Sequence, residues 1–170
     1  KRDEAFGRLS VRVGVVAGLL ASFVTLFPTG SLNGRTVAVY QPVKLAAMEG
    51  VFRTQPGAPM AIVGMPDTEK GLLLDPIEIP GALSFLIYGS FDAPVRGLND
   101  VPIDDRPPVE LVYYAFHIMV GLGTIFIAIY LVAAVALWRG RIYGTPLVLW
   151  ALMLAIPFPY IANQAGWVVA

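Results

Sequence analysis

The sequence contains no cysteine and a single histidine, His117, among its 170 residues. The absence of cysteine excludes a disulfide framework and thiolate-bound metals. One histidine cannot supply a metal site that needs two or three imidazoles from the same chain. Charged residues are also scarce, at 14% of the chain, against about 25% in an ordinary soluble domain. The net charge is zero, which gives a nucleic-acid partner no electrostatic support, and we expect none.

The chain is instead rich in long apolar runs, and its mean hydropathy is +0.68. Three uncharged stretches are long enough to cross a bilayer, which requires about 20 mainly apolar residues. We place helices near Arg8–Phe27, Val109–Trp138 and Tyr143–Ile161. The predicted fold class is all-α integral membrane, with three transmembrane helices of a larger helical bundle plus a long extracytoplasmic loop.

The predicted organisation has five segments. Residues 1–28 form the first transmembrane helix with a cytoplasmic lead, and residues 29–108 form the loop. Residues 109–138 form the second helix, residues 139–142 a cytoplasmic turn, and residues 143–170 a truncated third helix. Both ends of the sequence look cut, so we expect a piece of a longer chain. Within the loop we expect a short helix near Val43–Phe52 and an apolar patch, Gly81–Tyr88, that packs onto the loop or dips into the membrane interface.

Basic residues indicate the orientation. They precede the first helix and fill the link between the second and third, where Arg139 and Arg141 stand. Lysine and arginine are enriched on the cytoplasmic side of membrane proteins. We therefore expect both regions in the cytoplasm and the loop outside, in a bacterial or archaeal plasma membrane.

Several side chains in the apolar helices are candidates for packing or chemistry. Gly14 and Gly18 have the spacing that lets helices approach closely. His117 is ionisable inside an apolar helix, which makes it a functional candidate, although a histidine at the interface fits its position equally. Met119 is an ordinary packing residue unless its thioether ligates haem iron. His117 and Met119 are about 200° apart on a regular helix and cannot face the same iron.

Two further segments have plain alternatives. Pro157 and Pro159 free backbone carbonyls in the third helix, and the amides that follow them fit a helix that breaks at the membrane interface. In the loop, Lys44 and Glu49 lie about 140° apart on a short helix that begins after Gln41. They could be two solvated surface charges, or both could touch one molecule bound at the end of the helix.

Five strings, taken in order along the chain, resemble the large haem-bearing subunit, subunit I, of cytochrome bd-type quinol oxidases. They are FPTG at 27–30, QPVKLAAMEG at 41–50, TQP at 54–56, FHIMV at 116–120 and PFPYIANQAGW at 157–167. The resemblance covers nearly the whole chain and corresponds to the carboxy-terminal portion of the family, from about its sixth helix through its eighth.

The resemblance implies roles for individual residues. Lys44 and Glu49 match the pair implicated in binding and oxidising ubiquinol or menaquinol. Met119 matches the methionine that ligates the iron of the low-spin haem b, with the opposite ligand upstream. A complete oxidase of this kind also holds a high-spin haem b and haem d, where oxygen is reduced. The implied partners are the upstream half of the same chain, a smaller second oxidase subunit and membrane lipid.

Three cofactor-binding positions depart from the best-studied relatives. His117 stands where many relatives have an arginine close to the low-spin haem. Gln164 replaces a glutamate that serves the high-spin haem b, and Tyr160 replaces a tryptophan near the haem pair. Two alternatives therefore stand beside a quinol:oxygen oxidoreductase: a paralogue that binds quinol or haem without reducing oxygen, and a membrane bundle subunit without enzymatic activity.

Overall fold

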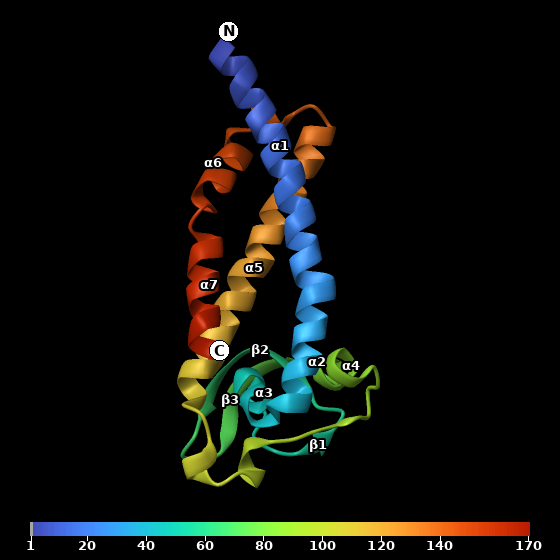
Figure 1. Ribbon diagram of the computed structural model, residues 1–170, viewed down its shortest axis with the longest axis vertical. Helices are drawn as coiled ribbons and strands as arrows, with labels where there is room; N and C mark the ends of the chain where they lie inside the picture. The colour runs from blue at the N-terminus through green and yellow to red at the C-terminus, as the bar shows by residue number, and fades with distance from the viewer. Residues whose placement is uncertain (1) are drawn as a thin grey trace.

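A computed structural model describes residues 2–170, and three apolar helical segments dominate it (Figure 1). The candidate membrane spans are Asp3–Val24, Ile103–Trp138 and Pro146–Val169. They correspond to helix α1 (Arg2–Val24), helix α5 (Val109–Trp138) and the pair α6 (Pro146–Leu154) and α7 (Phe158–Val169). Lys1, part of the predicted cytoplasmic lead, lies outside the described residues. The expected class, a helical membrane protein with three spans, is confirmed.

The first helix is longer than expected and continues into the loop. After α1 the backbone forms a π-helix at Thr25–Gly30 and then α2 (Ser31–Tyr40). The π-helix contains Pro28, which has no N–H to donate to the preceding turn. Such a widened turn is rare and occurs mostly as a single-turn bulge inside an α-helix. The helical rod therefore extends beyond its apolar body and joins the loop directly.

The third span is broken near its middle. Helix α6 ends at Leu154 and α7 begins at Phe158, with Pro157 as the residue before it. Pro157 and Pro159 both lack the N–H that a continuous helix needs. Because α7 runs on to Val169, Gln164 lies inside the third candidate span. This differs from a helix that ends near Ile161 with its amides beyond it.

The loop folds into a small mixed layer at one end of the helices (Figure 1). Its helices are α3 (Pro42–Glu49) and α4 (Ala82–Tyr88), followed by 3-10 turns at Leu98–Asp100 and Ile103–Asp105. Strands β2 (Met60–Asp67) and β3 (Leu72–Ile79) pair antiparallel, and β1 (Gln55–Pro56) pairs with β4 (Pro94–Val95). The sequence analysis did not predict either sheet.

Helix α4 is the apolar patch, and it packs onto the loop. Leu83, Ser84 and Ile87 are buried. The Ser84 hydroxyl accepts a hydrogen bond from the Ala58 N–H at 2.8 Å and donates one to the Ala93 carbonyl at 2.7 Å. A buried hydroxyl that is satisfied on both sides fixes α4 against the chain before and after it.

Two separate clusters of buried side chains hold the molecule together. One lies in the loop and includes the buried face of α3, α4 and the start of α5. The other lies at the opposite end, where Val15 of α1 meets Ala133 of α5, Ile142 and Val148. Between them, a Cβ on Gly18 would lie 2.1 Å from the Tyr130 ring. Gly18 therefore allows the close packing of α1 on α5, whereas a Cβ on Gly14, the other glycine of the predicted pair, would meet nothing within 4 Å.

The basic regions come together at the end far from the loop. The Tyr143 hydroxyl donates a 2.8 Å hydrogen bond to the Arg8 carbonyl, and the Arg8 guanidinium lies 4.9 Å from the centre of the Tyr143 ring. The lead of α1 and the segment after α5 are therefore on one side, as an even number of crossings requires.

Candidate functional site

Glu49 is the last residue of α3 and is almost completely buried. Pro42 starts this helix at its first turn, where a missing N–H costs nothing. Gly50 ends it in the left-handed conformation, with φ of 65°. Glu49 is 6% exposed, and no hydrogen bond or ion pair to its carboxyl occurs among the described residues. Burial raises its pKa from 4.5 to about 7, because a desolvated carboxylate is costly.

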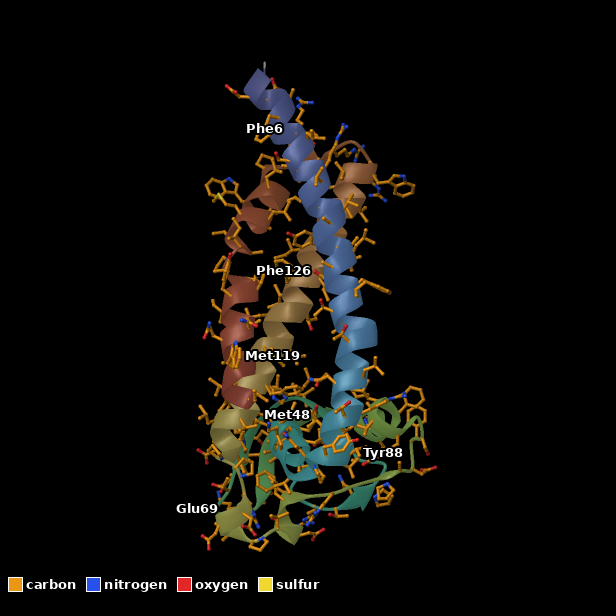
Figure 2. All side chains as sticks on the ribbon, in the orientation of Figure 1. Phe6, Met48, Glu69, Tyr88, Met119 and Phe126 are labelled. Atoms are coloured by element: carbon orange, nitrogen blue, oxygen red, sulfur yellow. The ribbon has the colours of Figure 1, made fainter. Side chains whose placement is uncertain are left out.

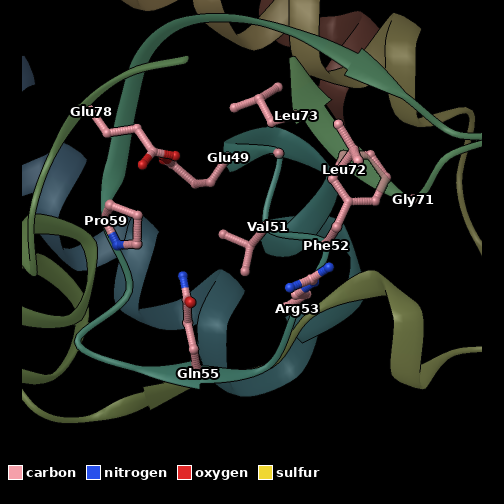
Figure 3. A pocket seen from close by; sticks show the side chains of 11 residues that line it. Glu49, Val51, Phe52, Arg53, Gln55, Pro59, Gly71, Leu72, Leu73 and Glu78 are labelled. Carbon is pink, nitrogen blue, oxygen red and sulfur yellow. The ribbon is translucent and has the colours of Figure 1, made fainter. Parts of the chain in front are cut away.

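The Glu49 carboxyl opens into a pocket of about 150 Å³ that is lined by α3, the following turn and β3. Glu78 of β3 lines the same pocket, and Figure 3 shows the two carboxylates pointing toward one another. Glu78 is exposed, so the pocket connects a buried acid with an accessible one. Arg53 and Gln55 also line it.

The side chain of Lys44 extends from α3 in a different direction from that of Glu49. Its ammonium donates a short hydrogen bond to the carbonyl of Ala170, just past the end of α7. Lys44 is partly exposed and does not line the Glu49 pocket. The two predicted catalytic residues are therefore close along α3 but face different surroundings. A molecule that touches both must lie across the helix.

Tyr113 of α5 packs beneath the turn that follows α3. It is 1% exposed, and its hydroxyl has no hydrogen-bond partner among the described residues. Its ring lies against Gly50, where a Cβ would come within 2.9 Å of a ring carbon. Tyr113 is packed beneath the loop, whereas its neighbour Tyr114 is 45% exposed.

His117 joins α5 to the loop. Its ring stacks on Tyr113 with centroids 3.9 Å apart. Nδ1 lies 2.9 Å from the Tyr113 carbonyl and Nε2 lies 3.2 Å from the Ala61 carbonyl of β2. His117 therefore contacts the loop and does not share a site with Met119, in agreement with their angular separation.

Met119 lies two positions further along α5, in the interface with α7 (Figure 2). A Cβ on Gly166 of α7 would lie 3.2 Å from its sulfur. Gly123, one turn further along α5 on the Met119 face, has open space beside it. The Met119 side chain is thus only partly buried, with Gly166 of α7 against its sulfur and Gly123 one turn away on its own helix.

Tyr160 and Gln164 stand one turn apart on the exposed side of α7. Tyr160 is 72% exposed, as is Trp167 one turn beyond Gln164. Gly166, which faces Met119, lies two positions from Gln164 and hence on a different face. The structure does not bring Tyr160 or Gln164 together with Met119, Lys44 or Glu49.

Comparison with known proteins decides the family. The family model described as Cytochrome bd terminal oxidase subunit I matches residues 1–170. The chain belongs to this family. It is 36% identical over 173 residues to the putative cytochrome bd menaquinol oxidase subunit I of Bacillus subtilis (strain 168), covering 100% of this chain and 38% of that one. It is 30% identical over 183 residues to the cytochrome bd ubiquinol oxidase subunit 1 of the same organism, covering 99% and 38%.

A solved structure of a family member is also similar. The bd oxidase from Geobacillus thermodenitrificans matches with a TM-score of 0.68 and 36% identity, covering 95% of this chain and 36% of that one. The chain thus spans less than half the length of the relatives it matches. The resemblance in the sequence is confirmed at the level of the family.

The haem that this family implies can be tested against the residues present. Within residues 2–170 there is no cluster of three or more histidine, cysteine or carboxylate ligands, so a site made only of such ligands is absent there. A single axial thioether needs none of them. Met119 offers that sulfur from a membrane-embedded helix, with Gly123 leaving room for a flat ring. The residues present fit one side of a haem.

Proposed function

We propose that the intact protein oxidises a quinol beside α3 and delivers the electrons to a haem b ligated by Met119. The substrate class and the haem type extend the family assignment, which by itself gives a terminal oxidase subunit. One relative is named as a menaquinol oxidase subunit and another as a ubiquinol oxidase subunit. Either quinol is compatible with the proposal.

The observation that carries the proposal is the state of Glu49. It is a buried carboxyl without a hydrogen-bond or ion-pair partner among residues 2–170, and its pKa is raised to about 7. A general base works best when its pKa is near the operating pH. A purely structural acid at this depth would normally be paired. Glu49 is therefore suited to take a proton from the quinol and to release it again.

Lys44 supplies the positive charge on the same helix. Its ammonium carries three donors and no acceptor, so it can donate to a quinol oxygen and stabilise the negative charge that develops as the O–H bond breaks. Lys44 lies in the first turn of α3 and is partly exposed, so its side chain stands at an accessible edge of this helix. We infer that the quinol ring lies across α3 at this edge, with one oxygen near Lys44 and a proton path to Glu49.

Met119 holds the electron acceptor in this proposal. Haem b, when bound, accepts electrons singly and passes them on. The contribution of this chain is the thioether, which raises the reduction potential of iron relative to a second imidazole. Gly123 leaves open space one turn from the sulfur, and Gly166 lets α7 pass close to it. His117, tied to β2, links the loop to the helix that carries this ligand.

The orientation and partners follow the same reasoning. Arg8, Arg12, Arg139 and Arg141 lie toward the end opposite the loop, which favours that end as cytoplasmic. We propose that the loop faces outward, so that quinol protons are released outside. The smaller second subunit, lipid and the upstream half of the chain would cover the exposed apolar faces of the helices.

The experiment is quinol oxidation by the full-length oxidase carrying Glu49→Gln. Glutamine keeps the shape but cannot accept a proton. Turnover should fall about 100-fold or more, the range that general base catalysis supplies, with the haem spectrum unchanged. Glu69→Gln is the matched control, because Glu69 lies at the exposed tip of the loop (Figure 2). Wild-type turnover in Glu49→Gln would refute the proton-acceptor role.

A second candidate function is a family paralogue that binds quinol or haem without oxygen reduction. It is favoured by Gln164 and Tyr160, which stand on one exposed face of α7 in place of the glutamate and tryptophan of the best-studied relatives. An amide is a weak neutral ligand and cannot take up a proton, so the high-spin haem b and haem d would be affected. Oxygen consumption with a quinol donor separates the two: a rate at background level with an intact low-spin haem signal favours the paralogue.

A further inference from the structure

We propose that Glu78 is the outer proton acceptor for Glu49 and that the pocket between them is the route by which protons leave the quinol site. The inference rests on the proposed function, because it needs Glu49 to receive a proton from the quinol. It adds a residue from a different part of the loop, 29 positions away along the chain.

The first step is the geometry of the pocket. Glu49 and Glu78 line one cavity and point toward one another across it (Figure 3). Glu49 is 6% exposed, and Glu78 is exposed on β3. Pairing with β2, in which Glu78 lies opposite Ala61, fixes the backbone of Glu78. One acid is therefore at the inner end of the pocket and the other at its mouth.

The second step is the size and lining of the pocket. Its volume of about 150 Å³ is below the roughly 300 Å³ at which pockets for drug-sized ligands begin. It is large enough for several water molecules, each of which occupies about 30 Å³ in the liquid. Arg53 and Gln55 line it together with backbone groups of the turn after α3. A small polar pocket of this kind suits proton transfer through water better than it suits a quinol with its tail.

Tyr113 of α5 packs behind the turn that lines the pocket. The Tyr113 hydroxyl is fully buried without a hydrogen-bond partner among the described residues, and its ring contacts Gly50, which lines the pocket. The charges of Glu49 and Glu78 both act on this phenol. Tyr113 itself does not line the pocket, so its ring supports the turn at Gly50 and its hydroxyl does not face the proton route.

The proton transfer balances as follows. A quinol O–H breaks, its proton forms an O–H bond on the Glu49 carboxylate, and the electrons go to the haem b of the proposed function. The Glu49 proton then moves through the pocket to the Glu78 carboxylate and on to bulk solvent. Glu49 is again a carboxylate and accepts the second proton of the same quinol. Because Glu78 acts through Glu49, it does not contact the quinol.

The test compares Glu78→Gln, Glu78→Asp and the control Glu69→Gln in the full-length oxidase. Glu78→Gln should lower kcat about threefold to tenfold with KM for quinol unchanged, a smaller loss than that of a direct general base. Glu78→Asp should retain most of the turnover. Adding a small buffer base such as imidazole should restore Glu78→Gln, because a mobile proton acceptor can enter an open pocket. Glu69→Gln should behave as wild type.

Each outcome decides between the two proposals. If Glu49→Gln loses turnover while Glu78→Gln matches Glu69→Gln, the relay is wrong and the proposed function stands. If Glu49→Gln keeps wild-type turnover, the proposed function fails together with the relay. A loss in Glu78→Gln that imidazole does not restore, or that appears in KM, would mean a structural or binding role and would also overturn the relay.

Discussion

The loop and the membrane helices differ in how much of their environment this chain supplies. The loop buries its own core, and five consecutive residues of α3, Leu45 to Glu49, are buried. In the three spans, the most apolar windows are only 6% buried inside the chain. The environment of the Glu49 carboxyl is therefore built by residues of this chain. The surroundings of Met119, Tyr160 and Gln164 are built only in part.

The two regions should therefore respond differently to substitution. Burial raises the pKa of Glu49, and the pocket beside its carboxyl is lined by α3, the following turn and β3, all within the chain. The haem side of Met119 depends on a ligand and a pocket wall that the proposal places outside it. Changes in the loop should thus alter proton transfer while the haem spectrum stays constant, and changes near Met119 should do the reverse.

The largest expected effect is in the helices. Met119→Leu in the full-length protein removes the sulfur but keeps an apolar side chain of similar volume. Reduced-minus-oxidised spectra should lose the low-spin haem signal. Met153→Leu is the control, because Met153 lies in α6 away from the α5–α7 interface. A low-spin signal that survives Met119→Leu unchanged would defeat the ligand assignment.

The next effect is the pH dependence of quinol turnover, which should depend on Glu49 in the loop. Only the carboxylate form of Glu49 accepts a proton, and its pKa is about 7. Turnover should therefore rise with pH and level off above 7, falling about tenfold for each pH unit below it. Glu78, Arg53, Tyr113 and His117 are the polar and charged groups around this site. The rate profile of Glu49→Gln should lack this inflection; an inflection that persists in the variant belongs to another group.

A smaller effect concerns the stability of the loop. Because the pKa of Glu49 is raised on folding, the folded state binds more protons between pH 4.5 and 7, and stability falls as pH rises through this window. Ionised Glu49 costs roughly 3 kcal/mol, from about 1.36 kcal/mol per pKa unit. Glu49→Gln should raise the melting temperature of the purified oxidase at pH 8 and leave it nearly unchanged near pH 4.5. An equal shift at both values would contradict the burial account.

The smallest effect compares two loop glycines. Gly50 and Gly89 stand at helix ends with φ of 65° and 73°, but only at Gly50 would an added Cβ come within 2.9 Å of the Tyr113 ring. Alanine at either position is strained. Gly50→Ala should be more destabilising than Gly89→Ala by about 1–2 kcal/mol, the cost of overpacking. Thermal unfolding of the two variants measures this difference, and equal losses would contradict the close packing of the Tyr113 ring on Gly50.

The membrane helices could be predicted from the sequence, whereas most of the structure of the loop could not. An uncharged run of this length indicates one helix, and α5 has the predicted bounds of Val109–Trp138. The strands escaped prediction because β2 contains Gly64 and Pro66 and β3 contains Pro76, residues that weaken strands. Irregular register between β2 and β3 further blurs the alternating pattern.

The same contrast applies to the site. Glu49 and Met119 were singled out by strings that resemble the family, and both can be described in structural terms. Glu78 had no signal, because an exposed acid in an unrecognised strand looks like any solvated charge. The burial of Tyr113 had no signal either, because its ring packs against Gly50, and these two residues are far apart in the sequence.

The central claim is that Glu49 takes up and releases a proton near neutral pH in a pocket built by this chain. Redox-induced infrared difference spectroscopy on the full-length oxidase tests it directly, because a protonated carboxyl has a resolved C=O stretch. The account predicts a carboxyl band that titrates with a pKa of about 7 and is absent in Glu49→Gln. A band that is unaffected by Glu49→Gln, or a Glu49 band that titrates near the ordinary value of 4.5, would contradict it.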